Sequence, residues 1–152
     1  MKAWGRTVLL LALLVPGVLT ATEATAGVSC HNLNAKGVGQ DLGGGSTVAD
    51  IIGGGLLQGT TEGNFTVTGF SGSVASFVGA VEFTTNNGAL TVTIEGTLDV
   101  ATGEFAASGP VTDATGKLEG ATGSLDFAGV EDLSDGSFVE DVTGNVCVDL
   151  AP

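Results

Sequence analysis

The fold is decided by the stretch GPVTDATGKLEGATGSLDFAG, which runs from Gly109 to Gly129. Its glycines surround a single Lys-Leu-Glu and stand at Gly109, Gly116, Gly120, Gly123 and Gly129. Glycine adopts positive φ angles and lets two backbones approach closely, so a cluster of glycines is typical of a tight connection. The spacing predicts a strand, a glycine-hinged loop with room for one helical turn, and a second strand containing Leu125 and Phe127.

Alternation of apolar and polar residues predicts a hairpin just before this stretch. One face of the segment 90–100 carries Leu90, Val92, Ile94, Leu98 and Val100, while Thr and acidic residues occupy the other face. The preceding segment likewise places Phe77, Gly79, Val81 and Phe83 on one face. A period of two indicates half-buried strands. Asn86-Asn87-Gly88 lies between the two segments, and Asn and Gly tolerate the positive φ of a tight hairpin turn.

Three Gly-x-Phe triplets are interpreted as further turns, at Gly63-Asn64-Phe65, Gly103-Glu104-Phe105 and Gly136-Ser137-Phe138. The last two also share an Asp four residues before the Gly. Segments 33–38 and 47–52 are expected strands separated by Gly43-Gly44-Gly45. No part of the chain after residue 26 keeps a helical period over three turns. The sequence predicts an all-β domain, a small closed antiparallel barrel of about eight strands. The alternative is a β-sandwich.

The two cysteines, Cys30 and Cys147, stand near the two ends of this domain. In an oxidising compartment an isolated pair is most simply one disulfide. Such a bond requires the first and last strands to be neighbours, as they are where a barrel closes. This requirement favours the barrel over the sandwich.

Residues 114–123, ATGKLEGATG, resemble the glycine loop of the allene oxide cyclase and dirigent barrel-like families. The family pattern is roughly G-G-T-G-x-F-x-G-A-x-G, with Leu118 here where Phe is commoner and Ala114 where Gly often stands. The resemblance implies a barrel that holds apolar substrates in an open mouth, for cyclisation of a fatty-acid epoxide or coupling of phenolic radicals. Dirigent sites use Arg with Asp, and this chain has no Arg after residue 26. No catalytic residue of either family can be placed.

The first 26 residues have the features of a secretory signal peptide. Lys2 and Arg6 precede a 13-residue, largely apolar segment from Thr7 to Leu19, and Ala24-Thr25-Ala26 forms a cleavage site. A membrane anchor would need roughly 20 apolar residues. We therefore expect a secreted, extracellular protein with a signal peptide over 1–26 and one barrel domain over 27–152.

The charge of the secreted chain limits its partners. Of the 17 acidic residues only Glu23 lies in the signal peptide, and the remaining bases are Lys36 and Lys117, so the net charge becomes −14. Such a surface repels phosphates and anionic lipids, so nucleic acid and membranes are not expected partners after signal cleavage. No cofactor is expected. The oligomeric state stays open.

Candidate site residues are few. His31 adjoins the predicted disulfide, a poor place for a catalytic base. Glu140 falls in phase with Phe138 and Val142 on an apolar face, and a buried carboxylate is costly enough to indicate function. A slip of one residue would turn it outward instead. The acidic cluster lacks the ordered spacing of a calcium loop and is interpreted as a solvated turn; it comprises Glu131, Asp132, Asp135, Glu140 and Asp141. Asn64-Phe65-Thr66 is a glycosylation sequon.

Two classes of function follow from these residues. The first is a secreted, non-catalytic barrel that binds an apolar small molecule or serves at the cell surface. The second is an isomerase or cyclase that confines a lipid-like or phenolic substrate, with Glu140 as its weak catalytic candidate. The lack of Arg, Tyr and Trp after residue 26 and the single His favour the first class. A hollow interior lined by Phe with one or two polar groups would favour the second.

Overall fold

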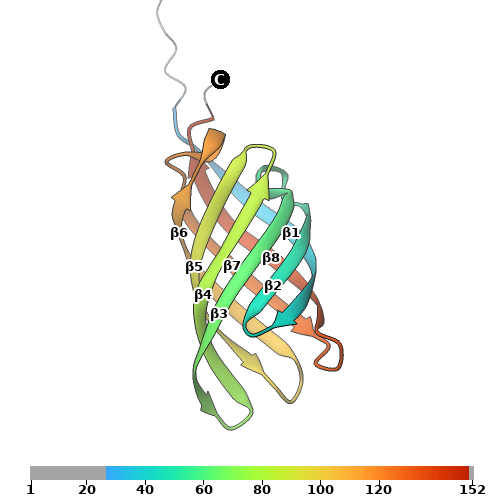
Figure 1. Ribbon diagram of the computed structural model, residues 1–152. Coiled ribbons are helices and arrows are strands. Elements are labelled where there is room, and N and C mark those ends of the chain that lie inside the picture. The colour runs from blue at the N-terminus through green and yellow to red at the C-terminus, as the bar shows by residue number, and fades with distance from the viewer. Residues whose placement is uncertain (1–26, 151–152) are drawn as a thin grey trace, which may run out of the picture.

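Eight antiparallel strands follow one another around a closed barrel in the computed structural model, which describes residues 27–150 (Figure 1). Each strand pairs with the next, and the last pairs with the first. The strands are β1 (Ser29–Gly43), β2 (Ser46–Gly53), β3 (Gly59–Ser71), β4 (Val74–Thr85), β5 (Gly88–Asp99), β6 (Glu104–Ala114), β7 (Thr122–Glu131) and β8 (Ser137–Val148). The predicted barrel is confirmed over the sandwich. The predicted signal peptide over 1–26 lies outside the described residues.

The glycine-rich stretch from Gly109 to Gly129 folds into the predicted strand, loop and strand. β6 ends at Ala114, the 3-10 turn η2 (Gly116–Leu118) follows, and β7 begins at Thr122. Gly116 and Gly120 have φ angles of +66° and +78°, which L side chains rarely adopt. The helical turn carries Leu118 into the barrel, where its side chain is fully buried.

The β4–β5 hairpin also agrees with the alternation of its sequence. It turns between Thr85 and Gly88, and Val81, Phe83, Leu90, Val92 and Ile94 face the interior. Val100 does not share that face, because β5 ends at Asp99 and the following residues form a turn. Its side chain is exposed.

One predicted turn is wrong. Gly63-Asn64-Phe65 lies inside β3 and pairs with both neighbouring strands. Gly63 has ordinary extended backbone there, so no positive φ angle requires a glycine. A glycine is needed because the neighbouring side chains leave no room for a Cβ atom. A Cβ atom at Gly63 would lie 2.4 Å from Thr47 Oγ1 and 2.6 Å from Phe65 Cζ. The sequence pattern is shared with the true turns, but the physical role of the glycine differs.

The other two Gly-x-Phe triplets are turns of one kind. The N–H groups of Gly103 and Gly136 each donate to the carbonyl of the Asp four residues earlier, Asp99 and Asp132, at 2.7 Å. Each Asp carboxylate also accepts a 2.9 Å bond from a backbone N–H two residues on. The Asp-to-Gly repeat therefore encodes the same turn at β5–β6 and β7–β8.

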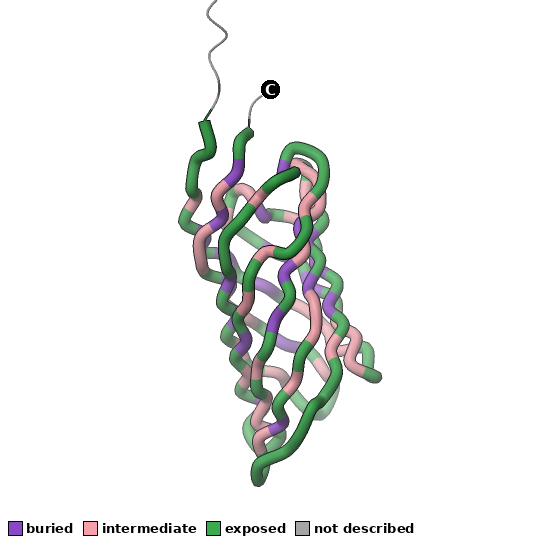
Figure 2. The backbone as a smooth tube through the Cα atoms, turned by 90° about the vertical axis from the view of Figure 1, so that its left-hand side faces the viewer, coloured by how far each residue is buried: buried purple, intermediate pink, exposed green. Residues whose placement is uncertain are grey.

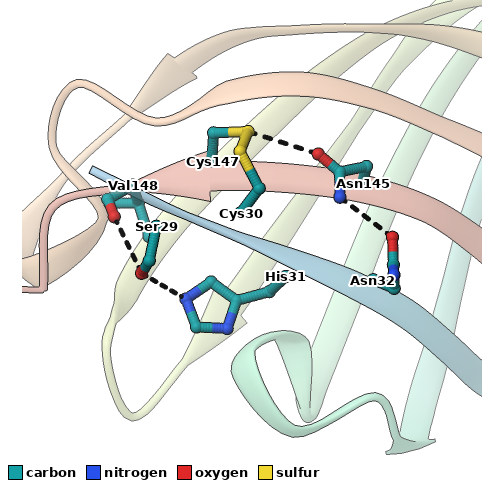
Figure 3. The surroundings of a disulfide bond; sticks show 7 residues. All are labelled: Ser29, Cys30, His31, Asn32, Asn145, Cys147 and Val148. Atoms are coloured by element: carbon teal, nitrogen blue, oxygen red, sulfur yellow. Dashed lines mark hydrogen bonds between the residues drawn. A yellow bond between two sulfur atoms is a disulfide. The ribbon is translucent and has the colours of Figure 1, made fainter. Parts of the chain in front are cut away.

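The disulfide between Cys30 and Cys147 joins β1 to β8 where the barrel closes, with an S–S distance of 2.01 Å (Figure 3). The pair lies on the outer side of the barrel, near both ends of the described chain. Asn145 Nδ2 donates to Asn32 Oδ1 at 3.0 Å farther along the same seam. His31 Nε2 lies 3.0 Å from Ser29 Oγ.

Most of the large buried side chains lie in the half of the barrel that carries the chain termini; Figure 1 shows both ends of the described chain at that end, and Figure 2 colours the buried residues purple. Two 3-10 turns, η1 (Gly55–Leu57) and η2, place Leu57 and Leu118 over that end. Below them lie buried side chains that include Phe83, Leu90, Leu125 and Val146. Within residues 27–150 there is no helix of the length and apolarity that crossing a membrane would require.

Candidate functional site

The opposite end of the barrel contains a cavity of about 240 Å³. It opens among the β1–β2, β3–β4, β5–β6 and β7–β8 turns, away from the termini. The wall is lower beside β2, because β2 pairs with β3 only as far as Asn64, whereas the β3–β4 hairpin continues to Ser71 (Figure 1). The apolar lining consists of Phe65, Val67, Phe77, Val81, Ile94, Leu98, Phe105, Ala107, Phe127 and Phe138.

The cavity stays open because four of its five phenylalanines lie across from a glycine on a neighbouring strand, whereas Phe127 pairs with Ala107 and Val142. The direct cross-strand pairs are Phe65 with Gly79, Phe77 with Gly96, Phe105 with Gly129, and Phe138 with Gly39. A Cβ atom added to any of these glycines would meet the paired ring at 2.3 to 2.7 Å. Each ring therefore fills the place of a missing side chain along the wall, and not the centre of the barrel.

The rings also contact one another around the cavity. The centroids of Phe65 and Phe77 are 5.4 Å apart, and those of Phe105 and Phe138 are 5.9 Å apart in an edge-to-face arrangement. Such pairs contribute roughly 0.5–1.5 kcal/mol beyond their buried area. The aromatic lining is therefore held in place in part by its own contacts.

One side of the cavity is acidic. Asp41 on β1, Glu131 on β7 and Glu140 on β8 all line it, and these three strands are adjacent around the barrel. Strands β3 to β6 contribute apolar side chains and Thr61 to the lining, β2 contributes Thr47, and β7 and β8 add Phe127 and Phe138 beside the acidic groups. The cavity thus has an acidic wall facing an aromatic and aliphatic one.

Glu140 points inward, in phase with Phe138 and Val142, as the alternation predicts. It pairs with Gly37 on one side and Gly129 on the other, and a Cβ at Gly37 would lie 2.6 Å from Oε1. Its carboxyl has no hydrogen bond or ion pair with the described residues. Burial in apolar surroundings disfavours the charged form and raises the pKa of Glu140 from about 4.5 to about 7.

Glu131 and Asp41 stand nearer the mouth. Burial raises the pKa of Glu131, and the negative charge of Asp41 raises it further. The carboxylate of Asp41 is fixed by a 2.7 Å bond from the N–H of Gly43 in the β1–β2 turn. The two groups add negative charge to the entrance of an otherwise apolar space.

The remaining acidic residues of the predicted cluster are dispersed. Asp141 faces outward and forms an ion pair with Lys36. Asp132 accepts bonds from the hydroxyl and N–H of Ser134, which lower its pKa, and Asp135 accepts from the N–H of Ser137. No group of three His, Cys, Asp or Glu side chains within residues 27–150 is arranged to hold a metal ion. The interpretation as a solvated turn fits Asp132 and Asp135 but not the inward Glu131 and Glu140.

Other predicted positions lie away from the cavity. His31 belongs to the filled end beside the disulfide (Figure 3), and Asn64 of the sequon is exposed on the outer face of β3. Asp41 is a cavity residue that was not predicted from the sequence. It follows Gly37 and Gly39 at alternate positions of β1, and this spacing places all three on the inward face.

Comparison of the chain with protein-family models, with curated proteins and with solved structures finds no match, so the function has to be inferred from the cavity itself.

Proposed function

We propose that this protein is a binding protein that holds a small apolar molecule in the open end of its barrel. The observation that carries the proposal is the cavity of about 240 Å³, lined by Phe65, Phe77, Phe105, Phe127 and Phe138. Concave, mostly apolar spaces with a few polar groups are the usual form of small-molecule sites. A protein that only needed a stable core would gain by filling this space, because burying apolar side chains stabilises the fold.

The size of the cavity limits the ligand. A cavity of about 150 Å³ already accommodates benzene, whereas pockets for drug-sized ligands span roughly 300–1,000 Å³. A volume of about 240 Å³ therefore suits a molecule of about one ring, or the end of a longer one whose remainder lies outside the mouth.

The same proposal places the protein outside the cell. A disulfide that joins the first and last strands is suited to an oxidising compartment, and the predicted signal peptide supports export. The intact mass of the exported protein tests this: it should correspond to a chain beginning at Gly27. Retention of residues 1–26, or two free thiols, would contradict it.

Binding itself is tested by calorimetry with 2-phenylethanol, a neutral molecule with one ring. We expect binding by the wild type and its loss in Ala107→Leu, because Ala107 lines the cavity and a larger side chain would enter it. Ala106→Leu is the matched control, since Ala106 is exposed on the same strand. Absence of binding by the wild type, or equal binding by both variants, would refute the proposal.

A second candidate function is proton-transfer catalysis, in which the barrel isomerises a lipid-like or phenolic substrate. It is favoured by Glu140, a carboxyl within the cavity whose pKa of about 7 suits exchange of a proton near neutral pH. The carboxylate would take a proton from a carbon beside an epoxide ring, the C–H electron pair would form a C=C bond as the ring C–O bond breaks, and the proton would return to the freed oxygen to give an allylic alcohol. Turnover of lipid epoxides by the wild type, lost in Glu140→Gln while 2-phenylethanol still binds, would establish this function.

A further inference from the structure

We propose that the cavity selects a small organic cation, a protonated amine carried on an apolar body of about one ring, over neutral and anionic molecules of the same shape. The inference rests on the proposed binding function and names the chemical class of its ligand. It is carried by the charges that line the cavity and by their position relative to the aromatic rings.

Every charged side chain lining the cavity is acidic: Asp41, Glu131 and Glu140. The lysines of the described chain are elsewhere, since Lys36 is on the outer face with Asp141 and Lys117 is in η2 at the opposite end. An anionic head group would be repelled by the three carboxyl groups, and the cavity lining has no basic side chain to bind it. A cation would find complementary charge, and charge complementarity governs which partners are excluded as well as which bind.

Glu140 and an aromatic ring meet at one point of the wall. A Cβ atom at Gly129 would lie 2.6 Å from Phe105 Cζ and 2.9 Å from Glu140 Cβ, so the two side chains converge over the same glycine. The ring of Phe138 packs edge-to-face against Phe105. An ammonium group beside Glu140 would thus bind a carboxylate and lie near aromatic rings, which also attract cations.

The surroundings favour an organic cation over a metal ion. Calcium takes six to eight oxygen ligands, yet the described part of the chain has no cluster of three potential metal-ligating side chains. The walls opposite the acidic side are apolar, so they supply contacts for a hydrocarbon body and no oxygen ligands apart from those of threonine. A one-ring amine would place its ammonium group against the acidic wall and its ring against the apolar wall.

Binding of a cation must depend on pH. The other titratable groups that line the cavity with Glu140 are Glu131 from β7 and Asp41 from β1, and the inward faces of β2 to β6 contribute none. With the empty cavity, the raised pKa keeps Glu140 about half protonated near pH 7. A bound ammonium favours the carboxylate, so affinity for the amine rises as pH increases through 7, and the amine in turn lowers the pKa of Glu140.

The test compares three probes of one framework by calorimetry at pH 8: 2-phenylethylamine, 2-phenylethanol and phenylacetate. Alkylamines resemble lysine, whose pKa is about 10.4, and remain protonated there. We expect the amine to bind at least about tenfold more tightly than the alcohol, or about 1.4 kcal/mol, and phenylacetate to bind more weakly than the alcohol. The advantage of the amine should shrink at pH 5.

Two variants locate the effect. Glu140→Gln should reduce the preference for the amine over the alcohol and remove most of its pH dependence, while binding of the alcohol persists. Asp141→Asn is the control, because it removes one negative charge from the next residue, which faces outward, and should change neither. A ¹³C NMR titration of the Glu140 carboxyl should show its pKa falling when the amine is added.

The outcomes separate the two proposals. If the alcohol binds in the cavity but the amine binds no better, the selection of cations is refuted and the binding function stands. Tighter binding of phenylacetate would also refute it. If none of the probes binds, the proposed function itself fails. An equal loss of amine preference in Asp141→Asn would show that general surface charge, and not the cavity, attracts the amine.

Discussion

The two ends of this barrel are built from the same eight strands but differ in what stands opposite most of their phenylalanines. At the filled end Phe83 pairs with Leu90, and the two side chains are completely buried. At the hollow end Phe77, on the same face of the same strand, pairs with Gly96. A large side chain opposite another large one fills a small barrel, whereas a ring opposite glycine rests against the wall. The choice of partner decides whether a small barrel has a core or a cavity.

The largest expected difference between the two ends is the energetic cost of losing a ring from β4. Phe83→Ala should lower the free energy of unfolding by about 3–5 kcal/mol, since it empties a fully buried site. Phe77→Ala should cost less than half as much, because that ring already borders open space. Urea unfolding of both variants measures the difference, and equal costs would mean that the hollow end is as tightly packed as the other.

The disulfide covalently links β1 and β8 at the filled end and should stabilise the fold. Replacing both Cys30 and Cys147 by Ser should lower the free energy of unfolding by about 2–4 kcal/mol, because the bond restricts a large loop in the unfolded chain. The two residues are 117 positions apart in sequence. Binding of 2-phenylethanol at the other end should be retained under conditions in which the variant is folded. Loss of binding by a folded variant would show that the two ends are coupled.

Glu140 should make the stability of the hollow end depend on pH. The folded protein holds this proton more tightly than the unfolded chain, so stability is greatest below about pH 4.5 and falls as pH rises to about 7. Glu140→Gln should therefore match the wild type at pH 4 and be more stable at pH 8, by up to about 3 kcal/mol at ~1.4 kcal/mol for each unit of pKa. Unfolding of both proteins across pH 4–9 measures the difference. If the difference in unfolding free energy between the two proteins did not change with pH, the Glu140 carboxyl would have to be solvent-exposed.

Substitution of the glycines of β1 should have the smallest effects on stability. The two positions compare crowding against backbone, at Gly39, with crowding against a side chain, at Gly37. Gly39→Ala should destabilise by about 1–3 kcal/mol, as overpacking does, because its Cβ would lie 2.4 Å from the carbonyl oxygen of Val48. Gly37→Ala should cost less, since the three atoms nearest to its Cβ would all belong to the movable side chain of Glu140. It should instead change the pKa of Glu140, which NMR can follow. A larger cost at Gly37 than at Gly39 would contradict this arrangement.

Local sequence signals predict most of the fold. The turn at Asn86-Asn87-Gly88 and the glycine loop after β6 depend on short-range chemistry, so they can be read from adjacent residues. The inward position of Glu140 follows from a period of two. The turn predicted at Gly63 was wrong because the same triplet serves two purposes, and only the strands beside it decide which one.

The cavity could not be predicted in the same way. Its volume depends on which residue lies opposite each ring, and Phe138 is separated from Gly39 by almost the whole domain. The acidic wall also joins residues from both ends of the chain, Asp41 from β1 and Glu140 from β8. Such pairs are fixed by strand register, which no local pattern specifies across the closure of the barrel.

An NMR titration with 2-phenylethanol tests the central claim most directly, because it compares the two ends in one experiment. Binding within the cavity should shift the methyl signals of Val81, Ile94 and Leu98, which line it, and leave those of Leu57 and Leu118 at the filled end unchanged. No shifts at all, or shifts confined to outward-facing residues such as Val139, would contradict a ligand-binding cavity at the hollow end.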